Sequence, residues 1–139
     1  MIYKFEGVTT IENQENNLVQ QAVDMIETDF PLLAGVDDLA DRLAVSKCHL
    51  IRSFTKKRGI SPGKYLVQVR LLAVMAYLVE EEYTVETIAG LTGFSCGNYL
   101  SKVFRRATGL SPCTFRETAQ KNTPQHSALM RRMEDISYL

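Results

Sequence analysis

The sequence lacks several features that mark other classes of protein. Its 139 residues contain no apolar run of the roughly 18 residues that a membrane-spanning helix needs. Met1–Gly7 holds one Lys, one Glu and no apolar core, so no signal peptide is expected there. Three Cys are too few, and odd in number, for a disulfide framework. These absences predict an intracellular, cytoplasmic protein from a reducing compartment, with no membrane partner.

The sequence also lacks the residue patterns of common enzymes. It contains no glycine-rich phosphate loop and no convincing Ser/His/Asp or paired-carboxylate set. Its two His, His49 and His126, lie far apart, and the Cys form no Cys-x-x-Cys ligand pair. We therefore expect no enzymatic activity, no metal and no cofactor.

Neither sign of charge is in excess, but the charges are sorted along the chain. The 16 Lys and Arg balance 16 Asp and Glu. Residues 46–79 hold seven bases and no acid, and residues 95–116 hold four bases and no acid. The segments 1–45 and 80–94 are strongly acidic instead. A single charge run is usually a solvated face, but two acid-free blocks favour a surface that faces a polyanion.

The two basic blocks resemble each other in sequence. Leu39-Ala40 and Ile88-Ala89 correspond at an offset of 49 residues. After one inserted residue, Gly59-Ile60-Ser61-Pro62 and Gly109-Leu110-Ser111-Pro112 correspond at an offset of 50. Two copies are too few for a solenoid, which needs about three repeats, so a duplicated module is the better interpretation.

Hydrophobic spacing predicts an all-α fold of about seven helices, with no convincing strand. The expected helices span 16–30, 36–43, 47–57, 62–82, 85–92, 96–107 and 112–120. Each copy contains a short helix, a turn and a second helix, which is the helix-turn-helix unit. Ser46 and Ser95 stand where the second helices need N-caps, and Gly59 and Gly109 stand where these helices end. The run 8–11 is β-prone, but it is short and alone.

These elements divide the chain into three parts. We expect an N-terminal extension at 1–16, a homeodomain-like helical domain at 17–120 and a C-terminal extension with helix-like spacing at 121–139. The domain holds helix-turn-helix units at 36–58 and 84–107. The linking helix at 62–82 would be about 30 Å long at roughly 1.5 Å per residue, close to the ~34 Å of one turn of B-DNA. That length suits two recognition helices in successive major grooves, although it also suits an ordinary core helix.

The order of the motifs is specific. The first copy runs from Leu39-Ala40 through Val45-Ser46-Lys47-Cys48-His49-Leu50-Ile51-Arg52-Ser53-Phe54 to Gly59. The second runs from Ile88-Ala89 through Gly93-Phe94-Ser95 and Tyr99-Leu100-Ser101-Lys102-Val103-Phe104 to Phe115-Arg116. The linking helix carries Arg70-Leu71. Over roughly 17–120 this set resembles the DNA-binding domain of the AraC/XylS family of bacterial transcription regulators.

The resemblance implies a transcription regulator, usually an activator, that binds double-stranded DNA at an asymmetric site and recruits RNA polymerase. The family usually adds an effector-binding or dimerisation domain, for which 1–16 and 121–139 are too short. The chain is then either a stand-alone member or an excised domain. The sequence leaves its oligomeric state, its operator and any effector open.

Helix geometry separates two faces on each recognition helix. Leu50 and Phe54, like Leu100 and Phe104, are four residues apart and should face the core. A second stripe consists of Cys48, Ile51, Arg52 and Thr55 in the first unit and Asn98, Ser101, Lys102 and Arg105 in the second. The resemblance places the base contacts on these positions. Arg and Lys suit guanine, Asn suits adenine, and the apolar Cys and Ile suit a thymine methyl group.

Other basic and hydroxyl side chains are assigned to DNA phosphates, where charge matters more than shape. The set is Ser46, Lys47, Lys56, Lys57, Arg58, Lys64, Ser95, Arg106 and Arg116. For the two serines, plain helix capping is at least as good an interpretation.

Two other functions stay open. A duplicated helical module could bind RNA polymerase or another regulator without reading DNA, which the apolar Cys48 and Ile51 and the zero net charge would allow. A thiol-dependent sensor or methyl acceptor is the third hypothesis, because some alkyl-repair proteins resemble this family in part.

The acidic residues of 24–41 cannot lie on DNA, so they either contact RNA polymerase or face solvent.

Overall fold

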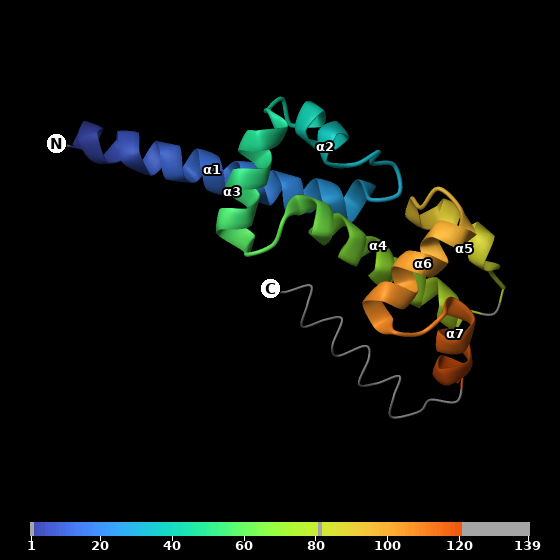
Figure 1. The fold of residues 1–139 in the computed structure, drawn as a ribbon. Coiled ribbons are helices and arrows are strands. Elements are labelled where there is room, and N and C mark those ends of the chain that lie inside the picture. The colour runs from blue at the N-terminus through green and yellow to red at the C-terminus, as the bar shows by residue number, and fades with distance from the viewer. Residues whose placement is uncertain (1, 81, 121–139) are drawn as a thin grey trace. The chain divides into compact units, whose positions relative to one another are not determined.

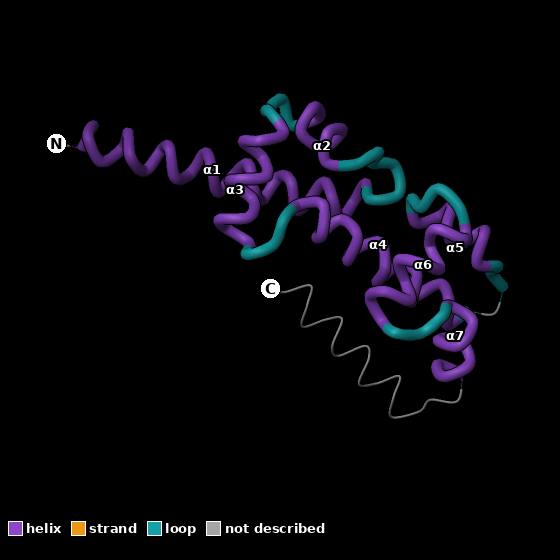
Figure 2. Tube along the Cα trace, viewed as in Figure 1, coloured by secondary structure: helices purple, strands orange, loops and turns teal. Residues whose placement is uncertain are grey.

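The structure, a computed structural model, describes residues 2–80 and 82–120 (Figure 1). The regular elements of these residues are all helices, and Figure 2 shows no strand among them. They are α1 (Ile2–Asp29), α2 (Val36–Arg42), α3 (Lys47–Arg58), α4 (Pro62–Val79), α5 (Val85–Thr92), α6 (Gly97–Thr108) and α7 (Pro112–Gln120). The predicted all-α fold with seven helices is confirmed for this part of the chain. Within it, no helix has the length and apolar character needed to cross a membrane.

The described residues form two compact units. Unit one comprises the residues up to 29 together with 33–66, and unit two comprises 30–32 together with the residues from 67 onward. Unit one contains the helix-turn-helix pair α2–α3, and unit two contains the pair α5–α6. The duplicated module of the sequence is therefore present as two separate structural units.

Helix α1 supplies the largest part of the core of unit one, and it contacts both α2 and α3. Its buried residues follow helical spacing, and they are Leu18, Val19, Ala22, Val23 and Ile26. Helix α2 adds Leu39 and Ala40, and α3 adds Leu50 and Phe54. One apolar face of each short helix therefore packs inward, as its spacing predicts.

Tyr65, near the start of α4, completes unit one. Its ring centre lies 5.7 Å from that of Phe54, and its hydroxyl donates a hydrogen bond of 2.5 Å to Glu27 Oε1 of α1. Burial and this hydrogen bond raise the pKa of Tyr65 to about 12. The Arg58 guanidinium lies 5.4 Å from the centre of the same ring. One side chain thus links α1, α3 and α4 within the unit.

Unit two buries an equivalent apolar cluster. Its buried members are Leu71, Val74, Met75, Leu78, Ile88, Ala89, Phe94, Leu100, Phe104 and Phe115. The rings of Phe104 and Phe115 are 5.5 Å apart, and they correspond to the pair Phe54 and Tyr65 of unit one. Phe115 has no hydroxyl group, so the polar link made by Tyr65 is missing at the matching position of unit two.

The two helix-turn-helix turns use the same backbone geometry. In unit two, Gly93 has a positive φ of 92°, and Phe94 N then donates to Ala89 O at 2.9 Å. In unit one, Ala44 takes the glycine position with a φ of 58°, and the same type of bond follows it. This is the left-handed helix ending that satisfies the last carbonyl groups of the first helix. The ending fixes the direction in which the chain leaves that helix.

Two predicted helix bounds were wrong. Helix α1 begins at Ile2, not at 16, so the β-prone run 8–11 is helical. A lone short run has no partner strand, and β-propensity alone is worth at most about 1 kcal/mol.

Helix α4 ends at Val79 and not at the predicted residue 82. Directly after Val79, Glu80 N closes a tight turn onto Tyr77 O at 3.1 Å. Glutamates are unfavourable at the negative end of a helix dipole. The predicted helical segment 121–139 lies outside the described residues.

The matched turns generate a stability prediction. A Cβ at Gly93 would lie 2.9 Å from Phe30 O, a backbone atom of the same unit, in a backbone conformation that favours glycine. We expect Gly93→Ala to destabilise unit two by about 1–3 kcal/mol. The reverse change, Ala44→Gly, relieves a left-handed alanine at the entropic cost of a glycine, so its effect should be within about 1 kcal/mol of zero. Urea unfolding of both variants tests this, and an equal loss of stability in the two would contradict it.

Candidate nucleic-acid interface

Helix α3 separates its faces as the spacing predicts. Leu50 and Phe54 are completely buried in unit one. Cys48, Arg52 and Thr55 are exposed, and Ile51 is half-buried. The predicted base-reading stripe is thus a continuous accessible surface along the helix.

Helix α6 repeats this division in unit two. Leu100 and Phe104 are completely buried. The outward stripe has exposed Asn98, Lys102 and Arg105 and half-buried Ser101. Tyr99, which the prediction omitted, is also 52% exposed, and its ring lies 6.0 Å from that of Phe94. An aromatic side chain therefore lies beside the first turn of this stripe.

The predicted N-cap of α3 is confirmed, and that of α6 was wrong. Ser46 Oγ accepts a hydrogen bond from His49 N at 3.1 Å. In unit two the capping residue is Cys96, whose Sγ accepts from Tyr99 N at 3.5 Å. The turn of unit two is one residue longer, so Ser95 falls within the turn and Cys96 takes the position of Ser46.

Basic side chains gather at the C-terminal ends of both recognition helices. The last turn of α3 holds Lys56, Lys57 and Arg58, and the last turn of α6 holds Arg105 and Arg106. These cations lie near the negative ends of the helix dipoles, where charge of this sign is stabilised. Neither α3 nor α6 contains an acidic residue. The exposed side chains of each recognition helix are therefore all neutral or positively charged.

The other basic residues of the predicted phosphate set have different surroundings. Lys64 is exposed in α4. Lys47, the first residue of α3, places Nζ 3.3 Å from Asp37 Oδ1, and both side chains are largely exposed. Because exposed ion pairs contribute at most about 1 kcal/mol, Lys47 can exchange Asp37 for a phosphate.

Arg116 has a structural role in place of the predicted phosphate contact. Its Nε donates to Leu78 O at 2.9 Å, and its Nη2 donates to the carbonyl oxygens of Glu80 and Tyr83. The side chain is half-buried and ties α7 to the end of α4 and the loop that follows. Its guanidinium is thus committed to backbone acceptors, so we remove Arg116 from the set of phosphate contacts.

Arg70 has a similar structural role in unit two. Its Nε donates to Phe30 O at 3.0 Å. Burial lowers the pKa of Arg70 from its ordinary value. No sequence signal distinguishes Arg70 or Arg116 from the exposed bases, because their partners are backbone carbonyls 33–40 residues away.

Cavities in the described part of unit one lie on different sides of this interface. One, of about 280 Å³, is lined by Glu15 of α1 and by His49, Arg52, Ser53 and Lys56 of α3. Three of its five lining residues carry basic groups, so it adjoins the proposed DNA-facing stripe.

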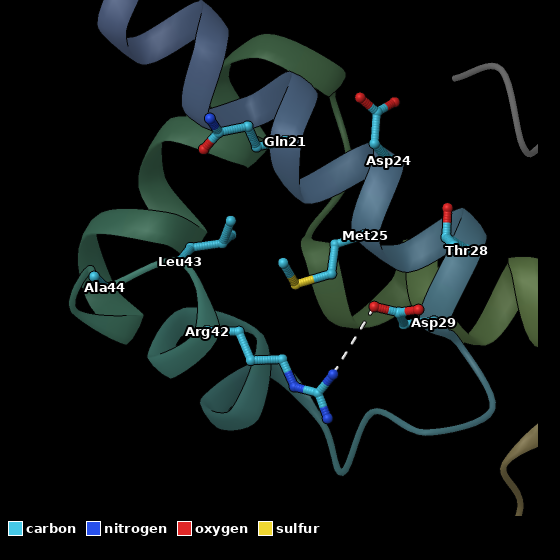
Figure 3. Close-up of a pocket in the computed structure, with 8 residues that line it drawn as sticks. All are labelled: Gln21, Asp24, Met25, Thr28, Asp29, Arg42, Leu43 and Ala44. Carbon is cyan, nitrogen blue, oxygen red and sulfur yellow. Dashed lines mark ion pairs between the residues drawn. The ribbon is translucent and has the colours of Figure 1, made fainter.

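Another cavity, of about 510 Å³, lies between α1 and the end of α2 (Figure 3). Met25 and Leu43 point toward each other across it, and Arg42 Nη1 lies 3.9 Å from Asp29 Oδ2 at its edge. Asp24 is a second acid in its lining. None of the predicted DNA-contacting residues lines this acidic cavity.

The thiols form no cluster in the described part of the chain. Cys48 and Cys113 are exposed, Cys96 is half-buried, and all three are free. No group of three or more His, Cys, Asp or Glu that could hold a metal ion was found among the described residues.

The structural role of Arg116 predicts a specific phenotype. Arg116→Met removes three hydrogen bonds from a charged donor and should destabilise unit two by about 2–4 kcal/mol. Where the variant stays folded, the slope of log Kd for DNA against log salt should equal that of the parent. The matched control Lys56→Ala should keep its stability and reduce the slope by about one. A reduced slope for folded Arg116→Met would restore Arg116 to the phosphate contacts.

Comparison with known proteins agrees with this geometry. A family model described as a helix-turn-helix domain matches residues 39–118. The transcriptional activator RhaS of Yersinia pestis is 30% identical over 104 residues, which are 75% of this chain and 38% of RhaS. The bifunctional transcriptional activator/DNA repair enzyme AdaA of Bacillus subtilis is 28% identical, over 76% of this chain and 50% of AdaA.

A solved structure extends the comparison to three dimensions. The DNA-binding domain of the global transcriptional factor AdpA, in complex with a target DNA, has a TM-score of 0.70 and 28% identity, covering 77% of this chain and 96% of that chain. The present chain spans half or less of the length of RhaS and AdaA. The family match runs from within α2 into α7 and so includes both recognition helices. The chain therefore belongs to the AraC-type helix-turn-helix family that its doubled motif resembles.

Proposed function

We propose that this chain is a sequence-specific binder of double-stranded DNA that regulates transcription as an activator. The observation that carries the proposal is the pair of acid-free recognition helices, each with a buried apolar face and an exposed polar stripe. The names of the relatives support it, because RhaS is a transcriptional activator and the AdpA domain was solved on its target DNA. The site of action would be the bacterial cytoplasm.

In the proposed complex, α3 and α6 enter successive major grooves of one asymmetric site. Arg52 and Lys102 donate to guanine O6 and N7, and Asn98 pairs with the N6 and N7 edge of adenine. Cys48 and Ile51 offer apolar contacts to thymine methyl groups. Unit one would then anchor on one arginine, while unit two reads more base pairs through polar contacts.

Phosphate contacts are proposed for the exposed bases that the fold leaves available. These are Lys47, Lys56, Lys57, Lys64 and Arg106. Arg58 lies over the Tyr65 ring, so it would reach phosphate only with its outer guanidinium edge. Ser46 already caps α3, and Ser95 is exposed in the turn before α6.

Activation requires a contact with RNA polymerase, for which the acidic face of unit one is the proposed surface. Asp24, Asp29 and Asp41 belong to α1 and α2, outside the recognition helix. Asp38 of the same face already accepts hydrogen bonds from the backbone N–H of Ala34 and from Arg42 Nε. These bonds, the Ala34 bond first, hold the pKa of Asp38 below its ordinary value. A face of this charge suits a basic partner surface and not DNA.

Two other functions are alternatives to this proposal. In the first, the chain is an interaction module that binds polymerase or another regulator without reading DNA. In the second, a thiol takes part in repair or sensing, as the name of AdaA suggests for that relative. The scattered thiols make the second less favourable. We propose a regulator without enzymatic activity.

Selection from a random pool of DNA duplexes at two salt concentrations tests the proposal. A DNA reader should enrich one asymmetric site with two short elements about one helical turn, ~10 base pairs, apart. Binding that is weak, salt-sensitive and without an enriched site would leave only electrostatic attraction and would favour the interaction module.

The reading residues generate a further prediction on the selected site. Arg52→Ala and Lys102→Ala should each weaken specific binding by about 1–3 kcal/mol and relax the preference at one position. Lys56→Ala is the matched control for Arg52, because both side chains line the same cavity. It should weaken binding to all sequences uniformly. Competition binding against single-base variants of the site separates the two effects, and an unchanged preference in both reader variants would refute the assigned stripe.

A further inference from the structure

Glu86 makes a contact that the sequence did not predict. It is the second residue of α5, and its Oε2 accepts a hydrogen bond of 2.8 Å from the N–H of Gly97, the first residue of α6. The bond joins the two helices of the helix-turn-helix pair directly. It also satisfies one of the N-terminal amides that a helix leaves without an internal partner.

The glycine at position 97 leaves the space that the Glu86 carboxylate occupies. A Cβ at Gly97 would lie 2.5 Å from Glu86 Oε2. Such a distance is far below van der Waals contact, so any larger residue would displace the carboxylate. The glycine that lowers helix propensity at this end of α6 therefore makes room for the Glu86 carboxylate.

The rest of the α6 N-terminus is weakly capped. The Cys96 sulfur accepts from Tyr99 N at 3.5 Å, whereas the Ser46 oxygen of unit one accepts from His49 N at 3.1 Å. Sulfur is a weak hydrogen-bond acceptor. A carboxylate at the positive end of the helix dipole is stabilising. Glu86 thus provides at α6 much of the fixation that Ser46 provides at α3.

Unit one offers a natural contrast at the matching position. Asp37 also occupies the second position of its helix, but it pairs with the Lys47 side chain and not with a backbone amide. An exposed ion pair with the long, flexible side chain of a lysine imposes little orientation. Only in unit two does the acid hold the backbone of the recognition helix.

We propose that Glu86 is the positioning residue for base reading by unit two. Its carboxylate fixes the first turn of α6, and Asn98 is the residue that follows Gly97 in that turn. A bidentate contact to adenine depends on orientation, so loss of the Glu86 bond misdirects Asn98 without unfolding the unit. This inference rests on the proposed DNA-binding function.

The test compares Glu86→Ala with Glu86→Gln on the site selected by the parent. Glu86→Ala should lose affinity for that site by about fivefold or more, and the lost base preference should coincide with the position that Asn98→Ala identifies. Glu86→Gln keeps an oxygen that can accept the Gly97 N–H, so it should retain the parent base preferences. By removing a negative charge near DNA, it should also bind all sequences about two- to fivefold more tightly at low salt.

Asp37→Asn is the matched control in unit one. It should raise affinity for all sequences through freed Lys47 and should leave every base preference unchanged. Gly97→Ala is the second route to the same displacement, with a residue that favours helix. It should reproduce the relaxed preference of Glu86→Ala even if that variant unfolds.

The outcomes separate the inference from the function on which it rests. If the parent enriches a site but folded Glu86→Ala or Gly97→Ala retains the preference at the Asn98 position, the positioning role is overturned. A Glu86→Gln variant as relaxed as Glu86→Ala would overturn it as well. If the parent itself enriches no site, the proposed function fails first, and the inference fails with it.

Discussion

In each unit the chain leaves its first short helix through a single residue with positive φ, and the backbone bond that follows fixes the path into the recognition helix. Gly93 adopts this conformation without steric cost, whereas Ala44 adopts it against the preference of an L-residue. The same backbone hydrogen bond closes both turns, from Val45 to Ala40 and from Phe94 to Ala89. The buried faces of α3 and α6 can meet their cores only if the helices start in that direction. The exposed stripes that we assign to DNA are the opposite faces of these helices, so their accessibility depends on the turn.

The two units use different side chains to cap the recognition helix and to link the helices around this shared turn. Unit one caps its recognition helix with Ser46 and links its helices through the Tyr65 hydroxyl. Unit two has a weaker cap at Cys96 and a phenylalanine in place of the tyrosine, and it uses Glu86 and Arg116 instead. Both of these are charged groups bound to backbone atoms, and hydrogen bonds of that kind are stronger than neutral ones. The two units thus share the backbone path of the turn and differ in the polar contacts that secure it.

The sequence was informative wherever a property depends on local spacing. Leu50, Phe54, Leu100 and Phe104 could be assigned to the core because a four-residue interval places them on one helix face. The N-cap of α6 could not be assigned, because serine is intrinsically the better cap and only the actual turn register gives the position to Cys96. Arg116 could not be distinguished from a phosphate-binding arginine, since its partners are carbonyl groups that any sequence would supply. The role of Gly97 could not be predicted either, because the Glu86 carboxylate that occupies the space of a side chain there lies 11 residues earlier in the sequence.

The zero net charge of the chain is compatible with DNA binding because electrostatic attraction is local. At physiological salt, charges are screened over about 8 Å. A phosphate near the C-terminal turn of α3 would therefore respond to Lys56, Lys57 and Arg58 far more than to acids elsewhere on the chain. Acids placed beside the recognition helices have a different consequence, since Asp37 and Glu86 repel phosphates whatever the base sequence. In the proposed complex they would reduce non-specific attraction without touching the bases. A modestly positive surface with two such acids would then obtain a larger share of its binding free energy from base contacts, which is the property that a sequence-specific regulator requires.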